Sequence, residues 1–182
     1  MNRLYVDLRK IRLHNYNGLA LIISLLFALI ALCYVIFHNP YKELHEQIFQ
    51  TADKVRKYYS DQPGYWKLNT QSAINDRLVG DKLLNPKYTF KIGIGADGET
   101  GMPSNNSFDI ALSDLNKSSC IGLVEAEINK NQQLSLQKIT IINSLGNTDF
   151  VWGDKNHPLP VVKYASRNIC QPTDNTVLWT FQ

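Results

Sequence analysis

The order of hydrophobic patterns along the chain predicts an α+β protein, with a long N-terminal helix packed on an antiparallel β-sheet. An uncharged apolar run extends from Leu19 to Phe37, and apolar residues after Pro40 recur at steps near three, four and seven, as in a helix. From about Tyr88 onward, apolar and polar residues alternate in several segments, as in strands. Helices followed by strands indicate the α+β class.

The apolar run is long enough to cross a membrane. It contains no charge and one hydroxyl, Ser24, and together with Gly18 it makes 20 residues, which rise about 30 Å as a helix. A cleaved secretory signal is the alternative, but the apolar core of such a signal is shorter and ends at small residues. Because this run ends in Cys-Tyr-Val-Ile-Phe-His-Asn-Pro, we expect a retained transmembrane helix over residues 19–38.

The charges on the two sides of the run predict its orientation. Residues 1–18 form a basic leader that contains Arg3, Arg9, Lys10 and Arg12, whereas the charges after the run are mixed. Positive charge stays on the cytoplasmic side of a span. We therefore expect a single-pass inner-membrane protein with a cytoplasmic N-terminus and a C-terminal domain that is periplasmic or extracellular.

Residues 39–62 continue the helix with one apolar face. Pro40 removes a backbone donor and clashes with the carbonyl four residues earlier, so we expect a kink there. Gln62-Pro63-Gly64 favours a turn that ends the helix.

Residues 63–182 form the exported α+β domain. Thr70 is a suitable cap for a short helix that carries Ile74, Leu78 and Val79, and Gly80 suits its end. Ser118 or Ser119 is suited to begin another helix. The segments with strand periodicity are residues 88–94, 107–112, 134–142 and 176–181.

Two of the three cysteines lie in the exported domain. Cys33 falls inside the apolar run, whereas Cys120 and Cys170 follow it. An oxidising compartment favours a disulfide between Cys120 and Cys170. Two unpaired buried thiols are the alternative.

Several classes of function find little support. The net charge of +3 comes partly from the leader, which leaves no large basic face for nucleic acid. Gly93-x-Gly95-x-x-Gly98 follows a predicted strand, but the next residues favour a loop, whereas a dinucleotide site needs a helix N-terminus there. We expect these three glycines to lie at the end of the strand and in a tight turn after it.

Metal binding and catalysis also find little support. The four histidines are scattered over the leader, the boundary of the span, the long helix and a loop: His14, His38, His45 and His157. No cysteine or carboxylate pattern completes a metal site, and no serine or cysteine has a recognisable nucleophile context. We expect no cofactor and no enzymatic activity.

The N-terminal features resemble those of type IV pilins and pseudopilins, in particular the type IVb group. Precursors of that family have a basic leader that ends in glycine, a cut directly after it, and a long helix. The resemblance places the cut between Gly18 and Leu19. Pro40 is then the twenty-second residue of the mature chain, a common distance for the helix-kinking proline of pilins.

The exported part resembles type IVb subunits as well. Similar stretches are Val55-Arg56-Lys57-Tyr58-Tyr59 before Tyr65-Trp66-Lys67-Leu68, Ala73-Ile74-Asn75 to Leu83-Leu84-Asn85-Pro86, and Phe108 to Leu115 ahead of Cys120-Ile121-Gly122-Leu123-Val124. Cys170 before the closing strand, residues 176–181, matches the second disulfide cysteine of the family.

Ile23 departs from the family pattern. It occupies the fifth mature position, where pilins usually have a glutamate that pairs with the N-terminal amine of a neighbouring subunit. Losing a carboxylate eases membrane residence and removes an intersubunit contact. Leu19 also replaces the usual phenylalanine or methionine. The resemblance implies that subunits without this glutamate tend to lie at a filament tip.

The resemblance therefore implies a minor or tip subunit of a type IVb-like pilus, inserted in the inner membrane before assembly. Its partners would be other pilin subunits, the assembly machinery, membrane lipid and a prepilin peptidase. An uncleaved single-pass anchor with an exported binding domain, in a secretion or conjugation envelope complex, is the alternative. An anchored enzyme is a third possibility.

Overall fold

The structure, a computed structural model, describes residues 18, 20, 22–30, 40–97 and 106–182. The chain divides into two units, Met1–Asn39 and Pro40–Gln182. In the first unit, residues 22–30 are helical and their large apolar side chains are exposed. None of the helices among the described residues has both the length and the apolar character needed to cross a bilayer. The predicted span over residues 19–38 extends beyond the described residues and stays a prediction.

The amphipathic segment of the sequence forms helix α2 (Pro40–Tyr59). Its apolar stripe is buried, including Leu44, Ile48 and Val55, because residues three, four and seven apart share one helix face. Gly64 follows with a φ of 136°, a conformation that glycine adopts without steric cost. The predicted kink at Pro40 depends on residues 31–39, which lie outside the described part.

The short helix near Thr70 differs from its prediction in both of its ends. Helix α3 (Thr70–Asn75) is capped by Asn69, whose side chain accepts a hydrogen bond from the Ser72 N–H. The Thr70 hydroxyl instead accepts from the Ile94 N–H at 2.9 Å and donates to the Ile94 carbonyl at 3.2 Å. The helix stops well before Gly80 because Arg77 adopts a φ of 56°, which no right-handed helix allows.

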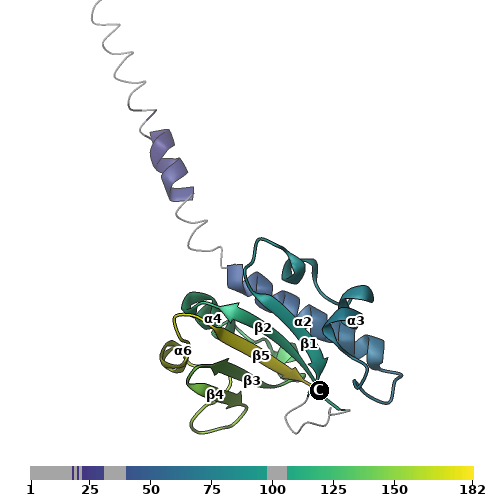
Figure 1. The fold of residues 1–182 in the computed structure, drawn as a ribbon. Coiled ribbons are helices and arrows are strands. Elements are labelled where there is room, and N and C mark those ends of the chain that lie inside the picture. The colour runs from purple at the N-terminus through teal and green to yellow at the C-terminus, as the bar shows by residue number, and fades with distance from the viewer. Residues whose placement is uncertain (1–17, 19, 21, 31–39, 98–105) are drawn as a thin grey trace, which may run out of the picture. The chain divides into compact units, whose positions relative to one another are not determined.

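A five-stranded antiparallel sheet forms the centre of the second unit (Figure 1). Its strands are β1 (Lys91–Ala96), β2 (Phe108–Leu115), β3 (Leu136–Asn143), β4 (Gly146–Val151) and β5 (Asn175–Phe181). Their spatial order is β1-β2-β5-β3-β4, so that β5 pairs with both β2 and β3. The predicted α+β class is confirmed, and β4 is a strand that the sequence patterns did not predict.

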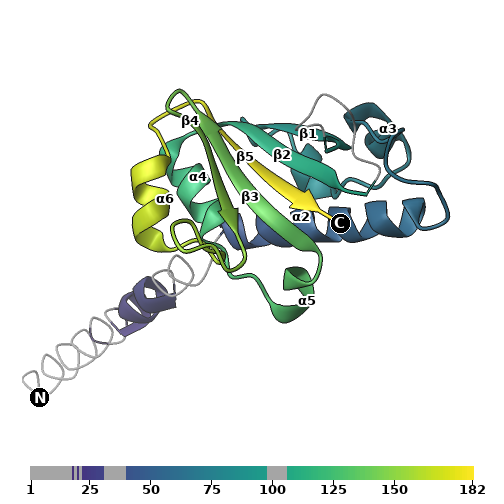
Figure 2. The ribbon, with the colours of Figure 1, turned by 90° about the horizontal axis from the view of Figure 1, so that it is seen from below.

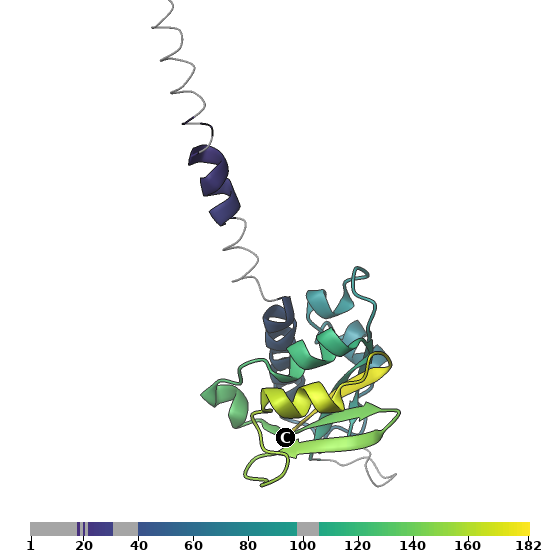
Figure 3. The ribbon, with the colours of Figure 1, turned by 90° about the vertical axis from the view of Figure 1, so that its left-hand side faces the viewer.

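Four shorter helical elements complete the second unit. They are the 3-10 helix η1 (Asp81–Leu84), α4 (Lys117–Val124), α5 (Lys130–Gln133) and α6 (Lys163–Ile169). Only α4 was predicted, and its cap is Asn116, whose side chain accepts from the Ser119 N–H at 2.9 Å. Figure 3 shows α4 lying between α2 and α6.

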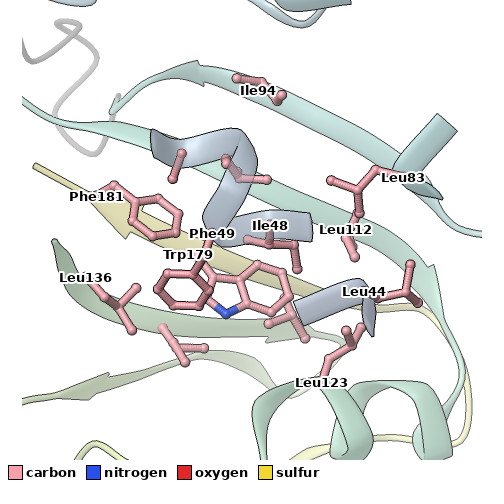
Figure 4. Packing of buried hydrophobic residues seen from close by; sticks show 14 of the residues in the cluster. Leu44, Ile48, Phe49, Leu83, Ile94, Leu112, Leu123, Leu136, Trp179 and Phe181 are labelled. Carbon is pink, nitrogen blue, oxygen red and sulfur yellow. The ribbon is translucent and has the colours of Figure 1, made fainter. Parts of the chain in front are cut away.

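The core of the second unit lies between α2 and one face of the sheet (Figure 2). Alternate residues of the central strand β5 point into it, so Val177, Trp179 and Phe181 are fully buried. Trp179 packs beside Phe49 and Ile48 of α2 (Figure 4). The inward-pointing side chains of the strands and the apolar face of α2 thus pack together in one continuous hydrophobic cluster.

Candidate functional site

The site residues predicted at the N-terminus are only partly described. Gly18 is helical, and open space surrounds the position that a Cβ would occupy. Ile23 is also helical, with 46% of its surface exposed. Leu19, the residue after the expected cut, lies outside the described residues, and Pro40 is the first residue of α2. The structure therefore leaves the cut between Gly18 and Leu19 as a prediction.

Cys120 and Cys170 form a disulfide, with their Cα atoms 6.0 Å apart. Cys120 lies in α4 and Cys170 caps the C-terminal end of α6, and both are fully buried. The bridge closes a segment with a sequence separation of 50 residues, which contains α5, β3, β4 and α6. The predicted disulfide is confirmed, and two free thiols are excluded.

A buried asparagine holds the chain that follows Cys170. The Asn175 side chain donates to the carbonyls of Leu115 and Gln171 at 2.9 and 2.8 Å, and it accepts from the Gln171 N–H at 2.7 Å. Asn143 donates to the Ile169 carbonyl at 2.9 Å. These bonds fix the route from α6 into β5. Sequence reasoning missed Asn175, because asparagine before a strand is common in ordinary turns.

The Ser166 hydroxyl joins α6 to α4. It donates a hydrogen bond to the Glu125 carboxylate, and Ser166 itself is fully buried. A charged acceptor makes such a bond stronger than a neutral pair. Since Glu125 and Ser166 both lie between Cys120 and Cys170, this bond links the two ends of the segment that the disulfide closes.

A half-buried carboxylate lies on β2. The pKa of Asp109 is raised to about 6, chiefly by burial; a hydrogen bond from Thr180 opposes this rise, and the negative charge of Asp97 adds to it. The Thr180 hydroxyl donates to Asp109 Oδ1 at 2.7 Å. Asp109 was not singled out from the sequence, since its desolvation results from neighbours far away along the chain.

The described residues contain no group of three or more histidine, cysteine, aspartate and glutamate side chains placed to hold a metal ion. Gly93 and Gly95 lie within β1, whereas Gly98 is not described. His45 is buried in the core, and His157 lies in the loop after β4. The histidines of the second unit thus belong to separate environments.

Three surface hollows differ in chemistry. The first, of about 190 Å³, lies where Tyr41 and Leu44 of α2 approach Leu123 of α4. The second, of about 390 Å³, lies between α2 and α5 and includes Glu46 and Arg56. The third, of about 470 Å³, lies beyond the C-terminal end of α2; we call it the distal hollow.

The arrangement of α2 along one face of a five-stranded antiparallel sheet, with a disulfide-closed segment before the central strand, is a type IV pilin-like fold. One solved structure that shares it is TcpA, a type IV pilin from Vibrio cholerae El Tor biotype. The TM-score is 0.54 over 78% of this chain and 98% of that chain. With 13% sequence identity, this is a likeness of fold. No protein-family model and no curated protein matches the sequence.

Proposed function

We propose that the chain is a structural subunit of a type IV pilus or a related filament, held in the inner membrane by residues 19–38 before assembly. The pilin-like fold of the second unit supports this function. The observation that carries it is the exposure of the large apolar side chains at residues 22–30, among them Phe27 at 70% and Ile30 at 64%. A contiguous exposed apolar surface marks a site of protein or membrane contact.

The mechanism we propose is packing. Each large apolar side chain contributes about 1.5 to 3 kcal/mol when it leaves water, so residues 22–30 favour either lipid or the apolar helices of other subunits. The second unit needs no such cover, since α2 already buries its apolar stripe against its own sheet. Assembly would therefore exchange lipid for neighbouring helices around the first unit.

Within that function, a minor or tip subunit of the type IVb-like kind is the finer proposal. Ile23 supports it, because a residue without charge makes no ion pair with the N-terminal amine of a subunit above. The proposed partners are other pilin subunits, the assembly machinery, membrane lipid and a prepilin peptidase that cuts after Gly18.

The mature N-terminus is the decisive measurement. In a strain with an active prepilin peptidase, we expect N-terminal sequencing to begin at Leu19, and Gly18→Val to leave the leader attached. Asn15→Ala, in the same leader, is the matched control and should be cut normally. An intact leader in the mature wild-type protein would overturn the proposal.

An uncleaved anchor with an exported binding domain is the second candidate. Ile23 and Leu19 favour it, because both depart from the usual pilin start. In that case, crosslinking would capture the protein in an envelope complex and never in sheared filaments. A subunit that is cut after Gly18 and recovered in sheared filaments excludes this candidate.

A further inference from the structure

The distal hollow is framed by three segments that are far apart in the sequence. Its lining includes Tyr59 at the end of α2, Gln62 in the turn that follows, Tyr65 after the turn, Asn106 before β2, and Gln182 after β5. Since α2 contains 20 residues, the hollow lies about 30 Å from Pro40 along the helix.

The walls of the distal hollow are held by hydrogen bonds and ring contacts. The Gln62 N–H donates to the Tyr59 carbonyl at 3.0 Å, and the Gln182 N–H donates to the Ser135 carbonyl at 3.1 Å. The ring of Tyr65 lies 5.6 Å from that of Tyr59 and 4.7 Å from that of Phe108, centroid to centroid. The backbone and the aromatic wall of the hollow are therefore in place before any ligand arrives, which lowers the entropic cost of binding.

Polar groups that line the distal hollow have unused hydrogen-bonding capacity. Within the described part of the chain, no hydrogen bond involves the Gln62 amide or the Tyr65 hydroxyl. Gln182 accepts from Gln137 Nε2 at 3.1 Å through its Oε1, which leaves its own amide N–H groups to donate elsewhere. An amide offers both donors and acceptors, and a phenol offers one of each.

The distal hollow differs from the other two hollows in the charge of the side chains that line it. The hollow beside α5 includes the charged Glu46, Asp53 and Arg56, and the hollow at Tyr41 is lined mostly by apolar and aromatic side chains. No side chain that lines the distal hollow carries a charge. Its chemistry suits a neutral ligand rich in hydroxyl groups.

An extended peptide fits this place poorly. A peptide that adds to a sheet needs a free edge strand, and the edge strands are β1 and β4. The distal hollow instead borders Asn106 and Gln182, at the ends of the interior strands β2 and β5.

We infer that the distal hollow binds a neutral saccharide. Sugar hydroxyls pair with amide donors and acceptors such as those of Gln62 and Gln182, and the C–H face of a sugar ring packs on an aromatic ring such as Tyr65. This inference does not depend on the filament function, since the hollow belongs wholly to the second unit.

The test uses the full chain in a zwitterionic detergent, because glycoside detergents would compete with a sugar. The probe is a panel of immobilised neutral oligosaccharides built from hexoses and N-acetylhexosamines, with sialylated sugars and an unstructured peptide on the same surface. We expect retention on at least one neutral oligosaccharide. Gln62→Ala and Tyr65→Phe should each weaken it about two- to tenfold, the loss of one hydrogen bond.

Gln71→Ala is the matched control. Gln71 lies on α3, outside the distal hollow, and its amide donates to Asn75 at 2.9 Å. The control should bind as the wild type does, and thermal unfolding of all variants should remain within about 2 °C of it. Retention on sialylated sugars alone or on the peptide alone, no retention at all, or full retention by both Gln62→Ala and Tyr65→Phe would overturn the inference.

Discussion

At the scale of single residues, two ring nitrogens in the core of the second unit have no hydrogen-bond partner among the described residues. His45 is 2% exposed, and neither its Nε2 nor the Nε1 of Trp179 makes a hydrogen bond. The His45 ring lies 4.8 Å from that of Phe49. Burial lowers the pKa of His45 to about 4, so the side chain is neutral in the folded protein at neutral pH.

We expect the contribution of His45 to stability to fall as the pH drops from about 6.5 to about 4. In this window the unfolded state binds a proton on His45 that the folded state does not, so this contribution to the free energy of unfolding rises with pH and becomes constant above the window. At pH 4.5 the His45 contribution is about 2.5 kcal/mol lower than at pH 7, and urea unfolding isolates it when the pH dependence of the wild type is compared with that of His45→Leu. His45→Leu should not show this loss.

Asp109 changes the free energy of unfolding in the opposite direction over a similar pH range. Its pKa is raised to about 6 in the folded state, so folding favours the protonated carboxyl, and this contribution is lost as the pH rises from about 4 to 6. Asp109→Asn should make the acid destabilisation of the wild type steeper. An equal pH dependence of the wild type and His45→Leu would contradict the assignment to His45.

The sequence predicted which elements contain these residues and not their surroundings. His45 was placed on the long helix, among histidines scattered along the chain. Whether such a position is buried depends on what packs there, and the ring contact with Phe49 together with the covering sheet cannot be derived from helical periodicity. Asp109 is similar, since its partner Thr180 lies 71 residues away.

At the scale of elements, α4 approaches α2 unusually closely. A Cβ built on Gly122 would lie 2.2 Å from Cδ2 of Tyr41 and 2.6 Å from its Cγ. These atoms lie at the base of the ring, where a small rotation of the side chain brings little relief. Gly122 is therefore required by the contact between the helices, although glycine is a poor helix former.

We expect Gly122→Ala to lower the free energy of unfolding by up to about 2 kcal/mol. Overpacking costs about 1 to 3 kcal/mol, and the better helix propensity of alanine offsets about 1 kcal/mol. Combining it with Tyr41→Ala should remove the clash, so a double-mutant cycle from urea unfolding should show coupling. Gly95→Ala, with open space at its Cβ, is the control. Additive effects would contradict the proposed contact.

Element prediction succeeded where periodicity and burial agree. Apolar and polar residues alternate in the segments that form β2, β3 and β5, and their apolar side chains belong to the core. Strand β4 was missed because only Phe150 among its residues is buried, as expected for an edge strand with little apolar content. Helix α6 was missed for the same reason, since the only residue that it buries completely is Ser166. The distal hollow was missed because it joins segments distant in sequence.

At the scale of the whole molecule, the Cys120–Cys170 disulfide restricts the unfolded chain more than the folded one. Closing a segment of 50 residues contributes about 4 kcal/mol in the loop-entropy account. The segment contains both strands of the β3–β4 hairpin, so the bridge limits how far these two of the five strands move away in the unfolded state.

We expect the double substitution Cys120→Ala and Cys170→Ala to lower the free energy of unfolding by about 4 kcal/mol. Chemical reduction of the wild type should have a similar effect, measured by urea unfolding with tryptophan fluorescence. Cys33→Ala removes the third cysteine and leaves the bridge intact, so it should match the wild type. Unchanged stability after reduction would contradict this account.

The position of β5 also bears on the proposed export of the chain. This strand comes last in sequence among the five, yet it lies between β2 and β3 and contributes Trp179 and Phe181 to the core. A chain threaded through a translocation pore from its N-terminal side has no complete sheet until β5 emerges. In the proposed exported protein, folding on the far side of the membrane would therefore wait for the final strand, and β2 and β3 would need protection from aggregation until it arrives.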